Sequence, residues 1–248
     1  MLGGGMQGPL QRTRDVGAVR RQNVITRVFL WIVALFGILP AALILLFRFL
    51  PVPVTPQMIF SAAGGHGMHY TWRGAGDIAP ALGVAVIAAE DQRFCSHNGF
   101  DWQSIDQAVK AHERGARLRG ASTISQQTAR SLFLVPVRSW VRKGVEAYLT
   151  VLLEALWPKT RILTAYLNLV DWGNGNFGAE AAARAYFRKP AAQLTRLEAA
   201  RLAAILPNPD DWRAARPGPY VQRRTGTLLA RMGQVRRDGL ASCIRHRG

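Results

Sequence analysis

The sequence predicts a mainly α-helical domain that a single N-terminal transmembrane helix anchors to a membrane. Residues 28–47 form an uncharged apolar stretch, and about 20 such residues are needed to cross a bilayer core. From Pro80 nearly to the end, apolar residues recur with the period of a helix. No segment alternates convincingly with the two-residue period of a strand. The 248 residues leave room for one sizeable domain, or for one domain plus an appendage.

The charges on either side of the apolar stretch predict its orientation. The tail of residues 1–27 carries five arginines against a single acid, whereas only Arg48 follows the stretch before Arg73. The positive-inside rule therefore places the N-terminus in the cytoplasm and the rest of the chain outside. Ala41 and Ala42 lie inside the apolar run rather than after it, which favours an uncleaved anchor over a signal peptide.

Five regions are expected along the chain. They are a cytoplasmic basic tail (1–27), the transmembrane helix (28–47), a Pro/Gly-rich linker with the start of the exported domain (48–79), the main domain (80–212) and a basic C-terminal segment (213–248). Within the linker, prolines predict an extended exit over residues 50–58, and glycines predict a surface loop over 61–76. His66 and His69 have a spacing that suits a metal on a helix, but the glycines around them argue against a helix.

The helices of the exported part follow from apolar spacing, caps and breakers. Asp101 is expected to cap a helix whose inward side carries Ile105, Ala108 and Val109. A basic break is expected over 114–120, and a tight loop over 171–176. The expected helices are 80–90, 102–116, 123–133, 140–156, 160–170, 178–187, 195–206 and 219–237.

The composition favours an anionic partner. The chain has a formal net charge of +17, most of it in the exported part. Because that part lies outside the cell, anionic lipid head groups or a lipid-linked diphosphate fit better than nucleic acid. Nine arginines against one acid over residues 213–247 indicate either a membrane-facing or disordered appendage, or a helix with a solvated face.

The two cysteines, Cys95 and Cys243, are too few for a disulfide framework. Their pairing is left open, and Cys95 is assigned a packing role only.

A cluster of charged residues follows the apolar helix that begins at Pro80. Three of the fifteen acidic residues of the chain, Glu90, Asp91 and Asp101, fall within twelve positions, together with His97. A helix that ends at Glu90 delivers a carboxylate where a core gives way to a cleft, and such a carboxylate is a candidate general base. The alternative is a helix terminus with solvated charges.

Three further segments have compositions that packing alone does not explain. Residues 120–130 gather hydroxyl and amide side chains at a helix start, which suits sugar or phosphate binding; the alternative is an ordinary N-cap with an exposed face. Arg142, Lys143 and Glu146 share one helix face, either as a carboxylate held between two cations or as a surface ion-pair cluster. Residues 159–168 indicate scaffold, with Asn168 lining or capping the site.

Together these segments resemble the peptidoglycan glycosyltransferases, which polymerise lipid II and also form the N-terminal domain of bifunctional penicillin-binding proteins. The motifs occur in the family's order: Glu90-Asp-Gln-Arg-Phe94 with His97 and Gly99, Gly120-Ala-Ser-Thr-Ile-Ser-Gln-Gln127, Arg142-Lys-x-x-Glu146, and Ile162-Leu-x-x-Tyr-Leu-Asn168. The resemblance covers about residues 80–212. It implies a lysozyme-like head with a small membrane-apposed jaw. No Ser-x-x-Lys motif of a transpeptidase occurs, so a monofunctional enzyme is expected.

The resemblance also implies roles for individual residues. Glu90 matches the catalytic base and Glu146 the second carboxylate, which positions substrate or relays to the diphosphate. The family's cationic positions that face the diphosphate match Arg130, Arg142 and Lys143. Arg130 stands where many relatives carry lysine, and its planar guanidinium changes the geometry of the hydrogen-bond donors. The remaining expected substrate-binding residues, some of which shape the surroundings of the base, are Asp91, Phe94, His97, Ser122, Thr123, Gln126 and Gln127.

The implied partners are lipid II, the growing lipid-linked glycan and the membrane, with cell-wall synthesis and division proteins as further candidates and no nucleic acid. The implied location is the bacterial inner membrane, with the catalytic domain in the periplasm.

No cofactor is expected to be required. A divalent cation, Mg or Mn, would suit the diphosphate, but no side-chain cluster in the sequence has the spacing of a dedicated metal site. Two other functions stay open: a lytic glycan hydrolase of lysozyme-like fold, and a catalytically silent membrane-anchored partner in wall assembly.

Overall fold

The structure is a computed structural model, and it describes residues 26–115, 122–137 and 139–244. The chain divides into two compact units, residues 1–46 and 47–248. In the first unit, the described part belongs to a helix that runs over Thr26–Phe49 with a mean hydropathy of 2.7 in its most apolar window. This helix contains the predicted span 28–47, and its length and composition fit a single-pass membrane anchor.

The anchor helix changes its winding before its proline. A π-helical turn, η1, occupies Ala34–Ile38, and α2 follows over Leu39–Phe49. Pro40 has no N–H, and its ring crowds the carbonyl four residues earlier. A π-turn directly before it accommodates this local mismatch while the helix continues.

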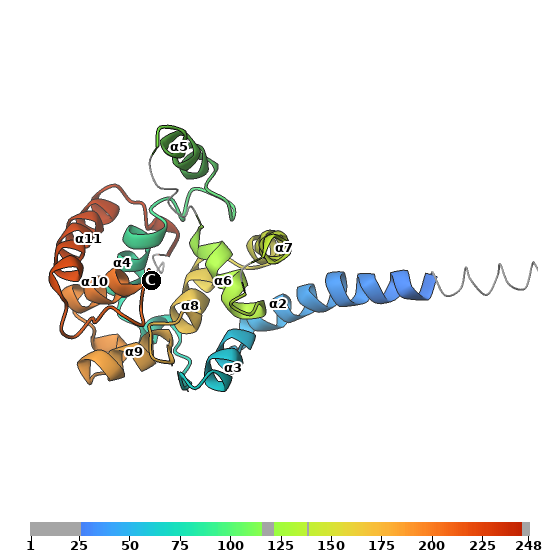
Figure 1. The fold of residues 1–248 in the computed structure, drawn as a ribbon, viewed down its shortest axis with the longest axis horizontal. Coiled ribbons are helices and arrows are strands. Elements are labelled where there is room, and N and C mark those ends of the chain that lie inside the picture. Colours follow the sequence, from blue (N-terminus) through green and yellow to red (C-terminus); the bar gives the residue numbers. More distant parts are fainter. Residues whose placement is uncertain (1–25, 116–121, 138, 245–248) are drawn as a thin grey trace, which may run out of the picture. The chain divides into compact units, whose positions relative to one another are not determined.

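The second unit is mainly α-helical, as the sequence predicts (Figure 1). Its two short strands pair in parallel, with His69 opposite Asn176 and Tyr70 opposite Phe177. Its elements are α3 (Pro56–Ala63), β1 (His69–Tyr70), η2 (Ala75–Asp77), α4 (Pro80–Glu90), α5 (Trp102–Glu113), α6 (Ile124–Phe133), α7 (Trp140–Leu156), α8 (Lys159–Leu169), β2 (Asn176–Phe177), α9 (Gly178–Phe187), η3 (Ala191–Gln193), α10 (Arg196–Ile205), α11 (Pro219–Arg237) and η4 (Ser242–Ile244).

The expectation for residues 50–76 is partly wrong. The extended exit ends at Thr55, whose hydroxyl accepts a hydrogen bond from the amide of Met58 and caps α3. Pro56 occupies the first helical position, where its fixed φ favours a helix and its missing N–H costs nothing. His69 lies in β1 rather than in a loop. A proline-rich stretch therefore starts a helix here, and only its first residues are extended.

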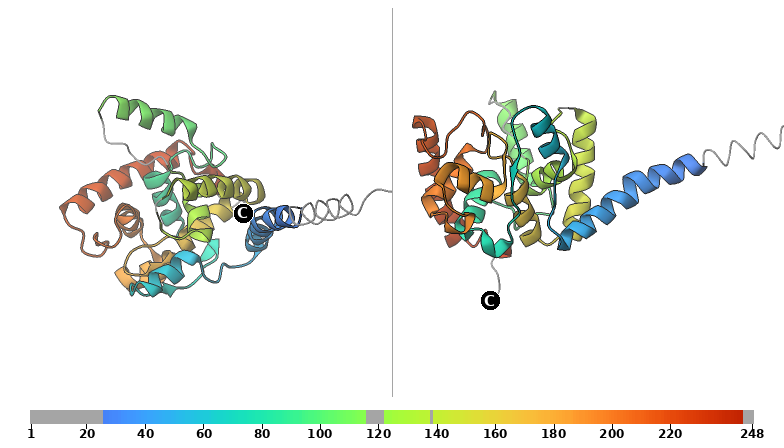
Figure 2. Two further views of the ribbon diagram at one scale, coloured as in Figure 1. Left: turned by 45° about the vertical axis from the view of Figure 1, so that its right-hand side comes forward. Right: turned by 90° about the horizontal axis from the view of Figure 1, so that it is seen from below.

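Helix α4 is enclosed by the rest of the unit. All seven residues from Leu82 to Ala88 are buried. α10 and α11 pack against α4 and lie together beside it in both views of Figure 2. α6 packs against both α7 and α8. This enclosure fixes the direction of α4 and hence the position of Glu90 at its end.

The C-terminal segment is an integral part of the second unit as far as Ile244. The buried side of α11 carries Val221, Thr225, Leu228, Met232 and Val235, while arginines such as Arg223 and Arg231 face solvent. The interpretation as a helix with a solvated face is therefore correct, and a disordered appendage is wrong for α11. Contact of its solvated face with a membrane stays a prediction. Residues 245–248 lie outside the described part.

The expected inward side of α5 is confirmed only in part, since Ile105 and Ala108 are half-buried and Val109 is exposed, whereas its cap is confirmed. Asp101 accepts a hydrogen bond from the Ser104 amide at 3.0 Å. No residue of α5 is buried, and Val109 is 46% exposed. The helix stands clear of its neighbours in Figure 1 and in the left view of Figure 2, so the described chain covers its apolar side only in part. Most of the expected basic break, residues 116–120, lies outside the described residues.

Cys95 and Cys243 form a disulfide across 148 positions of the sequence, with their Cα atoms 5.5 Å apart. The assignment of Cys95 to packing alone is therefore wrong. The bond ties the loop after α4 to η4 at the end of the described chain. Sequence spacing could not reveal this pair, because only the packing of α11 along α4 brings the two segments together.

We expect loss of this disulfide to lower the free energy of unfolding by about 3 kcal/mol, because a long closed loop restricts the unfolded chain. For a unit of this size this corresponds to a fall in melting temperature of about 6–12 °C. The double variant Cys95→Ser/Cys243→Ser, purified at full length in detergent, would be compared with the native chain by thermal unfolding. Dithiothreitol should lower the melting temperature of the native chain to that of the variant and leave the variant unchanged. Equal melting temperatures without reductant would contradict this expectation.

Candidate active site

Glu90 lies at the C-terminal end of α4, where the helix leaves the core. Its side chain is half-buried, and its Oε2 accepts a hydrogen bond from Gln127 Nε2 at 3.0 Å. Gln127 belongs to α6, and its Oε1 in turn accepts a hydrogen bond from the Tyr166 hydroxyl at 3.3 Å. A chain of hydrogen bonds from α8 through α6 therefore fixes the orientation of this carboxylate, and within the described residues its second oxygen has no hydrogen-bond partner.

Tyr166 belongs to a motif of the sequence but was expected to have no role in the site. It is fully buried, and this burial raises the pKa of its hydroxyl well above the usual value; the Glu90 carboxylate raises the pKa further, whereas Arg130 lowers it. The hydroxyl therefore stays protonated at neutral pH and acts as a donor. Its place in the apolar spacing of α8 indicated core, and only the fold shows that its polar end reaches Gln127.

We expect Tyr166→Phe to lower kcat about fivefold, because one hydrogen bond in the chain to Glu90 contributes about 1 kcal/mol. KM for lipid II should stay near the native value, since Tyr166 acts on Glu90 only through Gln127. Steady-state polymerisation assays would measure kcat and KM separately. Tyr220→Phe is the matched control, because Tyr220 is half exposed and packs on Trp212. An unchanged kcat in Tyr166→Phe would refute this positioning role.

Asp91 and His97 connect the loop after Glu90 to the start of α6. Buried Asp91 accepts a hydrogen bond from His97 Nε2 at 3.0 Å and another from the Ile124 amide at 3.0 Å. Phe94 lies edge-on to His97, with ring centroids 6.4 Å apart. Asp91 therefore joins this loop to α6, and a role of the three residues in shaping the surroundings of Glu90 stays a prediction. Direct contact of any of them with substrate stays a prediction.

The start of α6 is a capping box, which was the alternative explanation for its polar residues. The Thr123 hydroxyl accepts from the Gln126 amide, and the Gln126 side chain accepts from the Thr123 amide. The Thr123 hydroxyl also donates to the carbonyl of Gly99 at 2.6 Å. Both side chains are almost wholly buried, at 2% and 5% exposed. Their observed role is to build this turn, and substrate binding by them stays a prediction. Gly120 and Ala121 lie outside the described residues.

Glu146 is a buried carboxylate held between two cations, as one of the two interpretations of its segment predicted. It is fully buried, Arg142 Nη1 lies 3.1 Å from its Oε2, and Lys143 Nζ bonds its Oε1. The two cationic side chains keep 20% and 41% of their surfaces exposed. Because one buried charge anchors two cations, the outer side of this cluster carries net positive charge.

The two carboxylate clusters meet at Ser122. Gln127, which binds Glu90, also donates to the Ser122 carbonyl at 3.5 Å. Lys143, which binds Glu146, donates to the Ser122 hydroxyl at 3.4 Å. The structure therefore brings the candidate base, the amide of Gln127 and the cation cluster together around one turn of chain. Arg130 completes the positive side, since its charge acts on Tyr166.

Two polar residues near this site have structural partners. Glu154 accepts from Ser125 and from Lys159, whose Nζ lies 2.6 Å from it and 4.6 Å from the centroid of the Phe94 ring. Asn168 accepts from the Arg73 amide at 2.7 Å and donates to the Arg73 carbonyl at 2.9 Å. It therefore holds the segment before α4 in place and neither lines the cleft nor caps a helix.

Among the described residues, no group of three His, Cys, Asp or Glu side chains could hold a metal ion. Glu90 is engaged by the side-chain amide of Gln127, Asp91 by His97 and a backbone amide, and Glu146 by two cations. The donor set therefore does not fit a dedicated metal site, and no step below depends on one.

The fold and the site define a class of protein. A half-buried carboxylate at the end of a core helix, polar side chains beside it and a cluster of cations suit an enzyme that deprotonates a hydroxyl group and stabilises a departing anion. The apolar N-terminal helix suits a substrate that is found at a membrane.

Comparison with known proteins identifies the family. The transglycosylase family matches residues 58–233. A biosynthetic peptidoglycan transglycosylase of Caulobacter vibrioides is 49% identical over 228 residues, which cover 91% of this chain and 98% of that protein. Those of Rhodospirillum centenum and Cronobacter sakazakii are 51% and 45% identical over 214 and 237 residues, which cover 86% and 93% of this chain and 93% and 97% of the two proteins. The chain belongs to the transglycosylase family, and its lysozyme-like, mainly α fold is confirmed.

Proposed function

We propose that this chain is a peptidoglycan glycosyltransferase that polymerises lipid II into linear glycan strands. The observation that carries the proposal is the meeting of Glu90 and the Arg142–Lys143–Glu146 cluster around Ser122. A base for a sugar hydroxyl and a cationic site for a diphosphate are the two groups that this reaction needs. Membership in the transglycosylase family supports the same reaction.

In the proposed reaction, Glu90 takes the proton from the 4-hydroxyl of the acceptor's terminal N-acetylglucosamine. The hydroxyl oxygen attacks C1 of the donor's N-acetylmuramic acid, and the bond from C1 to the diphosphate oxygen breaks with inversion. Gln127 holds the Glu90 carboxylate toward the acceptor. Undecaprenyl diphosphate departs as an anion, so it needs stabilisation of charge more than protonation.

The cations Arg130, Arg142 and Lys143 are assigned to the departing diphosphate. Glu146 holds two of them in place through its ion pairs with Arg142 and Lys143. A divalent cation, Mg or Mn, would supply further charge neutralisation through the oxygens of the diphosphate itself, and the proposed chemistry proceeds without one.

The proposed location is the bacterial inner membrane, with a cytoplasmic N-terminus and a periplasmic catalytic domain. The apolar helix Thr26–Phe49 and the arginines that precede it support this orientation. The Cys95–Cys243 disulfide supports it independently, since disulfides persist in oxidising compartments. Cell-wall synthesis and division proteins are proposed as partners on the basis of the reaction alone.

The experiment that tests the function separates synthesis from degradation. Purified full-length protein would be incubated in detergent with fluorescent lipid II, and separately with preformed glycan. Conversion of lipid II into long glycan supports the proposal, whereas shortening of preformed glycan with intact lipid II would favour a lytic hydrolase. Binding of lipid II without turnover would favour a silent wall-assembly partner.

A further inference from the structure

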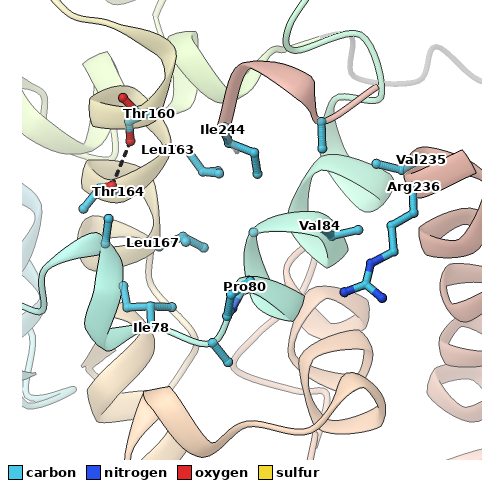
Figure 3. A pocket seen from close by; sticks show the side chains of 14 residues that line it. Ile78, Pro80, Val84, Thr160, Leu163, Thr164, Leu167, Val235, Arg236 and Ile244 are labelled. Carbon is cyan, nitrogen blue, oxygen red and sulfur yellow. Dashed lines mark hydrogen bonds between the residues drawn. The ribbon is translucent and has the colours of Figure 1, made fainter. Parts of the chain in front are cut away.

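An apolar cavity of about 580 Å³ lies between α4, α8 and η4 (Figure 3). It lies along the first turns of α4, near the N-terminal end of that helix. Its walls include Ile78, Val84, Leu163, Leu167 and Ile244. Pockets of 300–1,000 Å³ are typical of small-molecule sites. An apolar cavity of about 150 Å³ stays dry and takes up benzene, so this larger cavity has room for an extended hydrocarbon chain.

The cavity is a built feature of the fold. Gly83 contributes no side chain to it, and a Cβ there would lie 3.2 Å from Leu163 Cδ2 and 3.6 Å from Ile244 Cδ1. Ile244 follows Cys243, whose disulfide fixes η4 to the loop after α4. Figure 3 shows the side chains of Leu163, Leu167 and Ile244 projecting into the space beside α4.

One end of the cavity lies close to the point where the apolar helix ends. Thr160, in the first turn of α8, lines the cavity. The adjacent residue, Arg161, donates hydrogen bonds to the carbonyls of Phe47 and Leu50, and Phe47 belongs to the last turn of the apolar helix Thr26–Phe49. This end of the cavity therefore lies beside residues 47–50, which belong to the second unit.

The opposite part of the lining carries a positive charge. Arg236 is the one charged residue among the fourteen described residues that line the cavity. It is exposed, and it forms no hydrogen bond or ion pair within the described part of the chain. An exposed guanidinium next to an apolar cavity suits a ligand with a hydrocarbon chain and an anionic head group.

We propose that this cavity binds one acyl chain of an anionic phospholipid whose phosphate pairs with Arg236. The site is separate from the proposed polymerisation site. The cavity takes up the first turns of α4, from Pro80 to Val84, whereas Glu90 ends the helix about 15 Å beyond Pro80 at the rise of an α-helix. A bound phospholipid holds the catalytic domain against the bilayer independently of the anchor helix.

The proposal is tested by photolabelling of the full chain in vesicles of phosphatidylglycerol and phosphatidylcholine. The probe is phosphatidylglycerol with a diazirine in the middle of one acyl chain, and the matched probe is phosphatidylcholine with the same chain. Tryptic peptides 74–93 and 162–184 report on the cavity, and peptide 28–48 of the anchor helix is the internal reference. Fragmentation of peptide 74–93 separates adducts at residues 78–84 from adducts at Glu90.

We expect phosphatidylglycerol to label residues 78–84 and 163–167, and Arg236→Glu to lower this labelling about tenfold relative to the anchor peptide. Arg237→Glu is the control, since Arg237 is exposed on the same helix and does not line the cavity. Ala75→Trp, at the exposed rim, should block the cavity and abolish labelling there. Three outcomes would overturn the proposal. The two probes could label the cavity equally, the two arginine variants could lose labelling equally, or Ala75→Trp could leave the labelling intact. Displacement by undecaprenyl phosphate but not by unlabelled phosphatidylglycerol would overturn it too, in favour of a polyprenyl chain.

Discussion

We expect Glu90→Gln to lower kcat for lipid II polymerisation about a thousandfold, because a positioned general base typically contributes 10²–10⁴. The amide keeps the shape of the side chain and still accepts from Gln127 Nε2, as the carboxylate does at 3.0 Å. The fold and the binding of lipid II should therefore survive, with the loss confined to kcat. Initial rates with fluorescent lipid II, together with binding of lipid II to the inactive variant, would measure the two effects separately.

The control for this variant is Glu113→Gln, which makes the same change at an exposed position of α5. It should retain the native rate. If Glu90→Gln kept a rate within tenfold of the native enzyme, the proton would have to leave through another group, and the assignment of Glu90 as base would be wrong.

We expect Glu146→Gln to lower both stability and activity. The carboxylate is fully buried between Arg142 and Lys143, and removal of one partner of a buried ionic cluster costs about 4 kcal/mol of unfolding free energy. The cations also lose their anchor, so the stabilisation of the departing diphosphate should weaken. We expect kcat to fall about a hundredfold, in the range seen when one preorganised donor to a developing anion is lost. Urea unfolding and initial rates below the melting transition would measure the two effects.

Asp106→Asn is the matched control for the ionic part of this effect. Asp106 and Lys110 form an i,i+4 pair like that of Arg142 and Glu146, but with side chains 56% and 62% exposed. Exposed pairs contribute about 0–1 kcal/mol, so this control should change neither stability nor rate appreciably. Similar unfolding free energies for the two variants would show that Glu146 is not the buried anchor of the cluster.

The elements with a local cause were predictable from the sequence. The boundaries of α7, α9 and α11 agree with the predicted ranges, because caps, breakers and apolar periodicity lie within each segment. The ion pairs of Glu146 were also predictable, since spacings of three and four residues bring side chains together on one helix. The motifs around Glu90 pointed to the right family for the same reason: each motif is short and contiguous.

Other features depend on partners that are distant in the sequence. Periodicity gave α5 an inward side, but the described part of the chain covers that side only in part, and nothing within the segment reveals how much of it is covered. The basic segment after residue 212 looked like an appendage because its arginines dominate its composition, whereas α4 and α10 bury its sparse apolar side.

The sequence by itself determined the anchor helix, the mainly α-helical class, the family and the two carboxylates, since all of these follow from local composition and spacing. Tertiary structure alone decided what surrounds them. It paired Cys95 with Cys243, connected Tyr166 through Gln127 to Glu90, and brought the Glu90 and Glu146 clusters together at Ser122. The physical reason is that each of these contacts joins segments whose distance is set by the packing of α4, α6, α7 and α8, which a linear pattern does not encode.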